Sequence, residues 1–272
     1  YTLFGVTGAV RMALSAVDMA LWDALAIAYD KPLAEMLGGV ARPHRAYNSC
    51  GLGLMEPNKV ADEAELLLER GFTGVKLRLG YPTLGADIAT VRAVRERIGD
   101  AVVIPCDYNQ MLDRVDAIER GLALQREGLY WLEEPMRHDD WRGYADLAAA
   151  LDMPVQLGEN FNGPEGMAEA ITAGACDYVM PDVDRIGGVT GWLLAAGMAA
   201  DTGLPMSSHL FPEISVHLMA VTPTAHWIEY VDWADALLTE PLRIADGLAH
   251  PLPGSGTGMV WDEGKLALLR SL

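Results

Sequence analysis

Ionisable side chains recur at the ends of short apolar segments along this 272-residue chain. Lys76 and Arg78 come first, and single residues follow at intervals of 31, 26, 26, 23, 27 and 20 from Lys76: Asp107, Glu133, Glu159, Asp182, His209 and Glu229. Each interval is about the length of one strand, one helix and their connections. If the segments are parallel strands of one barrel, these side chains gather at its carboxyl-end mouth. Ionisable groups clustered in this way predict a functional site, although a single charged residue at a strand end is usually just solvated.

Three of the acidic residues, Asp107, Glu133 and Glu159, end three neighbouring segments. Carboxylates that converge in a partly dry site repel one another and cannot all stay ionised without a cation. Oxygen ligands without histidine or cysteine favour a hard divalent ion, best Mg²⁺. The alternative is that both glutamates pair with the two cations of the first segment and no metal binds. Asn109 and Glu134 add nearby oxygen, which favours the metal, but spacing alone does not separate Glu133 from Glu134 as the ligand.

The segment 74–79 alternates aliphatic and cationic side chains. In a strand, Val75, Leu77 and Leu79 would face the packed exterior of the sheet, and the two cations would face the other way. A buried cation is costly unless it has a carboxylate partner. We therefore predict that Lys76 and Arg78 point into the same site as the acidic residues. An edge strand with two solvated cations is the alternative.

His209 ends the segment 205–209, one unit after Asp182. A carboxylate that holds one ring nitrogen of a histidine fixes the tautomer and raises the basicity of the other nitrogen. We therefore predict that the two residues form a general-base pair, with a purely structural hydrogen bond as the alternative. His217, His226 and His250 lack such a placement and receive no role.

Eight apolar segments alternate with helical stretches and predict the fold. The segments cover 46–51, 74–79, 101–107, 130–133, 154–159, 178–182, 205–209 and 226–229, and helical stretches cover 58–70, 87–98, 115–127, 141–151, 164–173 and 190–202. Many of these stretches end in a glycine, the usual C-terminal stop: Gly71, Gly99, Gly128, Gly174 and Gly203. The pattern predicts an α/β fold with a closed parallel barrel. A doubly wound open sheet is the alternative, but no glycine-rich phosphate-binding fingerprint follows the first segment.

Composition excludes several classes of partner. The chain has 20 Lys+Arg against 38 Asp+Glu, a net charge of −18 without basic runs, so neither nucleic acid nor a membrane is an expected partner. Apolar runs are interrupted before they reach membrane-spanning length. Cys50, Cys106 and Cys176 are odd in number and lack CxxC spacing, so we expect free thiols in a reducing, cytoplasmic setting.

Short motifs along essentially the whole chain carry a family resemblance. They are Val-Lys-Leu-Arg at 75–78, Asp-Tyr-Asn-Gln at 107–110, Glu-Glu-Pro at 133–135, Gly-Glu-Asn at 158–160, Pro-Asp at 181–182 with Ile-Gly-Gly-Val-Thr-Gly at 186–191, Ser-Ser-His at 207–209 and His-Trp-Ile-Glu at 226–229. Together they resemble the mandelate racemase subgroup of the enolase superfamily. The resemblance implies a TIM-like (β/α)7β barrel, a small carboxylic-acid substrate, and a homo-oligomer. It also implies Mg²⁺ held by Asp107, Glu133 and Glu159 rather than Glu134.

The same resemblance implies roles for five further residues. His209 with Asp182 matches the pair that acts as base on one face of the substrate. Glu229 matches the acid that hydrogen-bonds the substrate carboxylate as it becomes an enediolate. Lys76 matches the first lysine of a Lys-x-Lys pair beside that carboxylate, and Asn109 matches a polar residue by the metal.

Two departures from the family pattern bear on function and domain organisation. Arg78 stands where the family has its second lysine, the base on the opposite face. The family also has an N-terminal α+β capping domain over the barrel mouth, and almost none of it precedes Met12. We expect residues 1–45, which read as helical on both sides of Pro32, to be the connection from the cap. Residues 46–272 are then the barrel with a C-terminal extension.

The expected reaction is Mg²⁺-dependent removal of the proton α to a carboxylate, through an enediolate. Racemisation needs a second base that gains and loses a proton near neutral pH, whereas an arginine stays protonated. The leading expectation is therefore dehydration of a 2-hydroxy sugar acid with His209 as the base. A mandelate-like 2-hydroxyacid racemase is one alternative, favoured by the motifs in the last third of the chain. A non-catalytic barrel that binds metal or acids is the other, motivated by the missing cap.

Overall fold

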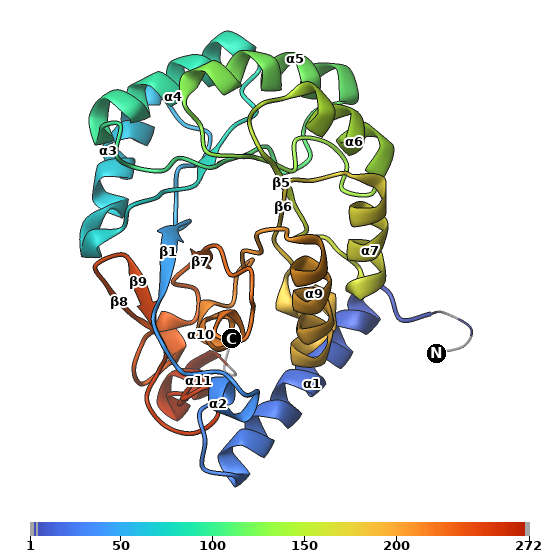
Figure 1. Cartoon of the computed structure of the whole chain (residues 1–272). Helices are drawn as coiled ribbons and strands as arrows, with labels where there is room; N and C mark the ends of the chain where they lie inside the picture. Colours follow the sequence, from blue (N-terminus) through green and yellow to red (C-terminus); the bar gives the residue numbers. More distant parts are fainter. Residues whose placement is uncertain (1–2, 4, 270–272) are drawn as a thin grey trace.

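The computed structural model describes Leu3 and residues 5–269, and strands in this part of the chain form a barrel surrounded by helices (Figure 1). Seven strands belong to the barrel, each separated from the next by at least one helix: β1 (His44–Asn48), β2 (Leu77–Arg78), β3 (Cys106–Asp107), β4 (Leu132–Glu133), β5 (Val155–Leu157), β6 (Tyr178–Val179) and β7 (Ile228–Tyr230). Strands β2 to β6 pair in parallel in sequence order, and β1 pairs in parallel with β7.

Isolated β-bridges join the two groups of strands, β1 with β7 and β2 to β6, into a closed barrel. Asn48 pairs with Val75, which joins β1 to the start of the β2 segment, and Val179 and Ala225 both pair with Met206. The segment 205–209 therefore occupies the seventh position of the barrel, as predicted. The segment forms isolated β-bridges at Met206 and His209 and no continuous ladder, so it is not the regular strand that was predicted. The predicted closed (β/α)7β barrel itself is confirmed.

Helices surround the barrel as an outer layer, most clearly α3 to α7 and α9 in Figure 1. Their bounds are α3 (Pro57–Leu67), α4 (Leu84–Ile98), α5 (Arg114–Leu124), α6 (Trp141–Ala150), α7 (Gly163–Ala173), α8 (Val183–Ile186), α9 (Gly188–Thr202), α10 (Pro212–Met219) and α11 (Glu263–Leu269). Side chains cap the first turns: Thr83 accepts from the Ala86 amide in α4, and Asp113 accepts from the Asp116 amide in α5. The predicted glycine stops are also present, since Gly174 and Gly203 have φ values of 66° and 71° just past α7 and α9.

Before the barrel, the chain forms α1 (Ala9–Ala28) and α2 (Leu33–Met36), and Pro32 directly precedes α2. Helix α1 packs against α8 and α9, where the Trp22 indole donates to the Thr190 hydroxyl at 3.0 Å. After the barrel, β8 (Arg243–Ala245) and β9 (Leu248–His250) form an antiparallel hairpin beside β1, which was not predicted. No described helix combines the length and apolar character needed to cross a membrane.

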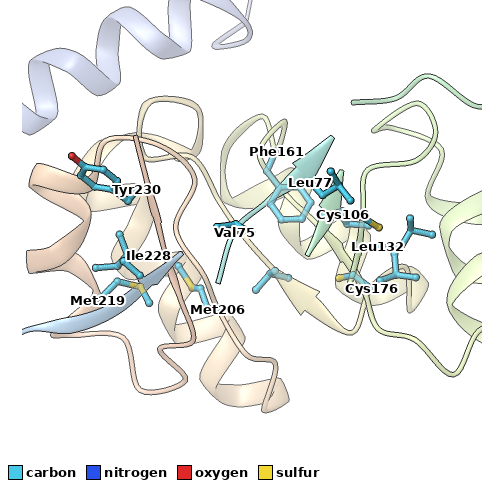
Figure 2. Close-up of a cluster of buried hydrophobic side chains, with 14 of the residues drawn as sticks. Val75, Leu77, Cys106, Leu132, Phe161, Cys176, Met206, Met219, Ile228 and Tyr230 are labelled. Atoms are coloured by element: carbon cyan, nitrogen blue, oxygen red, sulfur yellow. The ribbon is translucent and has the colours of Figure 1, made fainter. Parts of the chain in front are cut away.

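Aliphatic and aromatic side chains fill the space between the strands and the helices (Figure 2). Val75 and Leu77 are fully buried there, as is Leu132 on β4. Because side chains alternate along a strand, Lys76 points to the opposite face, into the barrel. The exterior packing of segment 74–79 thus directs its cations to the interior, as predicted.

A buried carboxylate ties the loop after β2 to the outer helices. Asp87, in the first turn of α4, is fully buried and accepts from the Gly80 and Tyr81 amides at 3.0 and 2.9 Å. Its other oxygen accepts from the Tyr108 hydroxyl at 2.7 Å and from Arg120 at 2.6 Å. The network joins the loops after the neighbouring strands β2 and β3 to helices α4 and α5.

We expect Asp87→Asn to lower the free energy of unfolding by about 3 kcal/mol, because it leaves the Arg120 guanidinium without its buried partner. Urea unfolding measures this change. Asp62→Asn is the matched control, since the ion pair of Asp62 with Arg97 lies on the surface and its loss should change stability little. Equal effects of the two variants would contradict the importance assigned to the buried network.

Candidate active site

The ionisable residues predicted from strand-end spacing do meet at one mouth of the barrel. Parallel pairing places Arg78 beside Asp107 and Asp107 beside Glu133 in direct register. A single parallel bridge places Asp182 beside His209 in the same way. Strand order and register therefore bring together residues that are up to about 150 positions apart in the sequence.

Lys76 lies at the centre of the site, and its side chain is completely buried. Its Nζ is 2.8 Å from Glu133 Oε1, 2.5 Å from Glu229 Oε1 and 3.3 Å from Asp107 Oδ2. Burial alone would lower the pKa of Lys76, but these carboxylates outweigh it and raise the pKa above its ordinary value. Lys76 is thus a permanent cation, and β2 is not a solvated edge strand.

Asp107, at the end of β3, is held by a cation and by an amide. Arg78 Nη1 forms a close ion pair with Asp107 Oδ2, and the partly exposed Arg78 also donates to Ser49 Oγ at 3.4 Å. Asn109 donates to the same carboxylate through its backbone amide at 2.7 Å and its side chain at 3.1 Å. Asn109 adopts a φ of 45°, which turns the chain back over Asp107.

The two adjacent glutamates after β4 point to different partners. Glu133 Oε1 faces Lys76, and Glu133 Oε2 accepts from the Trp131 indole at 2.9 Å and from Gln156 Nε2 at 3.5 Å. Glu134 accepts instead from the Asn160 side chain at 2.7 Å and the Gly158 amide at 3.4 Å. Burial raises the pKa of each glutamate to about 8. In Glu133 it does so although the positive charge of Lys76 lowers the pKa. Glu133, not Glu134, lies with Asp107 and Glu159.

His209 is buried between three carboxylates. Its Nδ1 is 2.6 Å from Asp182 Oδ2, and its Nε2 is 3.3 Å from Glu159 Oε2 and 3.7 Å from Glu229 Oε2. Asp182 is itself fixed, because its Oδ1 caps α8 through the amide of Asp184 at 2.7 Å. Burial lowers the pKa of His209, but the carboxylates outweigh burial and raise it to about 10. In return, His209 holds the pKa of Glu159 at about 2 despite burial.

Glu229, on β7, connects the lysine to the histidine. Burial raises its pKa, but Lys76 and His209 outweigh burial and hold the pKa well below its usual range. Glu229 Oε2 accepts from the Leu210 amide at 3.1 Å, while Oε1 faces Lys76. Glu229 is therefore anionic in this arrangement, and it is fixed from both sides.

The donor set at this mouth fits a divalent cation. One oxygen from each of Asp107, Glu133 and Glu159 lies within 4.8 Å of the other two, and all three residues are buried or nearly so. With Asp182 and Glu229, five carboxyl groups meet three groups that can carry positive charge: Lys76, Arg78 and His209. This excess of negative charge, on oxygen ligands alone, is the chemistry that Mg²⁺ requires.

Three further residues belong to the site but were not predicted: Ser49, Trp131 and Gln156. Ser49 follows β1 and contacts Arg78, whereas Trp131 and Gln156 reach Glu133 from inside the barrel. Trp131 lies two positions before Glu133, so strand alternation could have placed it on the same face. Ser49 and Gln156 carry no comparable signal.

Comparison with known protein families agrees with this geometry. Residues 59–265 match the family model of the enolase C-terminal domain. Residues 3–38 match the N-terminal domain model of mandelate racemase and muconate lactonizing enzyme. The chain belongs to the mandelate racemase and muconate lactonizing enzyme group of the enolase superfamily. The resemblance stated from the motifs is thus confirmed.

Individual relatives in this superfamily bind magnesium or act on sugar acids. L-talarate/galactarate dehydratase of Salmonella typhimurium is 36% identical over 95% of this chain, which spans 65% of that enzyme's length. A magnesium-bound enolase from the alphaproteobacterium BAL199 is 46% identical, with a TM-score of 0.96 over 98% of this chain and 74% of the other. An enolase from Bradyrhizobium complexed with magnesium and mandelic acid is 42% identical, with a TM-score of 0.93 over 98% and 73%. The predicted Mg²⁺ cofactor is confirmed by these relatives together with the carboxylate group of this chain.

Proposed function

We propose that this chain is the catalytic barrel of a Mg²⁺-dependent enzyme that removes the proton α to the carboxylate of a small 2-hydroxy acid. The observation that carries the proposal is the pair of His209 and Asp182 beside the carboxylate group, with Nε2 directed at the centre of the site. The sugar-acid dehydratase among the relatives supports dehydration as the outcome.

In the proposed reaction, Asp107, Glu133 and Glu159 would hold the cation. When bound, Mg²⁺ stabilises the charge that develops on the substrate carboxylate and offsets the carboxylates that raise the pKa of His209. Lys76 adds a fixed positive charge beside that carboxylate. An incoming substrate carboxylate raises the pKa of Glu229 by repulsion, so that Glu229 donates a hydrogen bond to the substrate oxygen.

His209 Nε2 accepts the α-proton. The neighbouring carboxylate of Asp182 accepts a hydrogen bond from the Nδ1–H group, which keeps Nε2 free and stabilises the imidazolium that forms. Loss of the β-hydroxyl from the enediolate then gives an enol, and the enol becomes the 2-keto-3-deoxy acid. In this proposal protonated His209 returns its proton to the departing hydroxyl, which leaves as water, so the step is balanced without a second base.

The charge state of Arg78 supports a mechanism in which His209 is the single base. Burial lowers its pKa, but Asp107 outweighs burial, so the guanidinium stays charged. Its ion pair with Asp107 and its contact with Ser49 hold it as a fixed donor. Racemisation is the second candidate function, and the relative that holds mandelic acid favours it. It would require a base on the opposite face of the substrate.

The proposed function is tested by incubating the protein with Mg²⁺ and a panel of aldonic, aldaric and mandelate-like acids, followed by detection of 2-keto-3-deoxy products. Product is expected with at least one sugar acid, and none after chelation of the metal. A folded protein that binds Mg²⁺ but leaves every acid in the panel unchanged would favour the non-catalytic alternative.

Arg78→Lys provides a further test. We expect the variant to keep dehydration within about tenfold of the wild type, because one charge-assisted contact to Asp107 is weakened rather than lost. A lysine can also lose its proton near neutral pH, so the variant should gain inversion of a 2-hydroxy acid. Polarimetry measures the inversion. Rapid inversion by the wild type, at equal rates from both enantiomers, would show that Arg78 itself acts as a base.

A further inference from the structure

A row of buried polar side chains crosses the barrel interior beneath Glu133. We call Gln156, Ser207, His226 and Tyr130 the polar row. Gln156 and Ser207 are fully buried, His226 is 9% exposed, and Tyr130 is half-buried at the far end. Successive contacts measure 3.5 Å from Glu133 Oε2 to Gln156 Nε2, 3.3 Å from Gln156 Oε1 to Ser207 Oγ, 3.4 Å from Ser207 Oγ to His226 Nδ1, and 2.9 Å from His226 Nε2 to the Tyr130 hydroxyl.

The acceptor at one end of the polar row determines the direction of every hydrogen bond in it. Glu133 Oε2 already accepts from the Trp131 indole, and the sulfur of Met180, a weak acceptor, lies 3.1 Å from the same Gln156 nitrogen. Gln156 therefore turns its NH₂ group toward these two acceptors and its carbonyl toward Ser207. Ser207 then donates to that carbonyl, and its remaining lone pair accepts from His226. All donors consequently point toward Glu133.

The same reasoning assigns the tautomer of His226. Nδ1 carries the proton that is donated to Ser207, and bare Nε2 accepts from the Tyr130 hydroxyl. Burial, with a smaller contribution from Arg45, lowers the pKa of His226 to about 4. Arg45 donates to the His226 backbone carbonyl at 2.7 Å, and the aromatic rings of Tyr178 and Trp131 border the imidazole. His226 is therefore a neutral donor rather than a cation.

We propose that the polar row positions Glu133 for the cation, with Gln156 as the direct positioning residue and Ser207 and His226 fixing the orientation of the Gln156 amide. The inference rests on the proposed function, because it takes Glu133 as a metal ligand. Gln156 and Trp131 both donate to Oε2, so Oε1 is left on the side of Lys76 and Asp107. A reversed amide would direct its carbonyl at the carboxylate and repel it. Partners of this kind, which orient a ligand without touching the metal, commonly change metal affinity by about 10–100-fold.

Magnesium calorimetry on three variants tests the positioning role. Gln156→Met keeps the side-chain volume but removes the donor, and it should weaken Mg²⁺ binding about tenfold. Ser207→Ala should weaken it about threefold by freeing the Gln156 amide to reverse, and it should have no further effect in the Gln156→Met background. Thr222→Val is the control, since it removes a buried hydroxyl that contacts Trp192, outside the row. The control should lose some stability and keep its Mg²⁺ affinity.

Nitrogen-15 NMR of the histidine ring gives a readout that does not depend on the metal. His226, identified by the signal missing from a His226→Gln variant, should show a protonated Nδ1 and a bare Nε2 at neutral pH. The opposite tautomer, or Mg²⁺ affinities unchanged in both Gln156→Met and Ser207→Ala, would overturn the proposal. Additive effects of the two substitutions would overturn it as well. A wild-type chain that binds no Mg²⁺ would instead overturn the proposed function, while the tautomer would still decide whether the row is oriented as inferred.

Discussion

Replacement of His209 by asparagine should abolish proton removal, with a loss of about 10²–10⁴-fold in turnover. Asparagine preserves a polar side chain beside Asp182 and Glu159 but has no nitrogen that accepts a proton. Because Arg78 is held by Asp107 and stays charged, we expect that it does not replace His209 as a base. Product formation and α-proton exchange should therefore disappear together.

The control for this variant is His250→Asn. His250 lies on β9, in the hairpin after the barrel, and has no role in the proposed reaction. It should leave turnover and α-proton exchange unchanged. Calorimetry should also give His209→Asn a Mg²⁺ affinity close to that of the wild type, since His209 is not a proposed ligand. An active His209→Asn variant would show that another group takes the proton.

Glu133→Gln should remove measurable Mg²⁺ binding and, with it, all activity. The substitution deletes one of three charged ligands and leaves an amide that binds a hard cation weakly. The fold should survive, because burial and neighbouring carboxylates already disfavour the ionised form of Glu133 and raise its pKa to about 8. The glutamine oxygen can still accept from Lys76. Calorimetry and urea unfolding measure the two effects separately.

Glu134→Gln is the matched control, because it makes the same chemical change one residue along the chain. Glu134 accepts from Asn160 and the Gly158 amide and lies outside the carboxylate group. Its substitution should keep Mg²⁺ affinity within about tenfold of the wild type. If Glu134→Gln abolished binding while Glu133→Gln did not, the ligand assignment would be reversed.

The sequence was most informative about the residues at strand ends. A spacing of one strand and one helix, repeated from Lys76 to Glu229, predicts that these side chains meet because parallel strands of a barrel share one carboxyl-end mouth. Alternation in 74–79 likewise predicts that Lys76 points inward. These inferences need only the periodicity of a strand and the parallel order of the barrel.

Features that depend on contacts between distant segments were harder to predict. Segment 205–209 has the composition of a strand, yet it forms only single bridges to its neighbours. The hairpin of β8 and β9 does have a sequence signal, the Asp246-Gly247 pair, and both residues adopt the positive φ values of a two-residue turn. Its strands have only three residues each and no helix lies between them, so they do not fit the repeated pattern of one strand and one helix.

Gln156 and His226 show a second limit. A glutamine or histidine within an apolar segment can simply pack in the core, or it can orient a ligand across the barrel. The residue type alone does not distinguish these two roles. His226 received no role from the sequence because it does not end its strand at the mouth. Only the contacts from Glu133 to Tyr130 reveal that the two residues belong to one row.

The most direct test of the central claim is proton NMR in D₂O of the wild-type protein, with Mg²⁺ and the sugar acid that it dehydrates best. We expect Mg²⁺-dependent loss of the α-proton with formation of a 2-keto-3-deoxy product, from one configuration at the α-carbon and not from its epimer. Both loss and product should be absent from His209→Asn. Exchange at equal rates from both configurations, or exchange that persists without Mg²⁺, would contradict a single histidine base that acts beside a magnesium-binding carboxylate group.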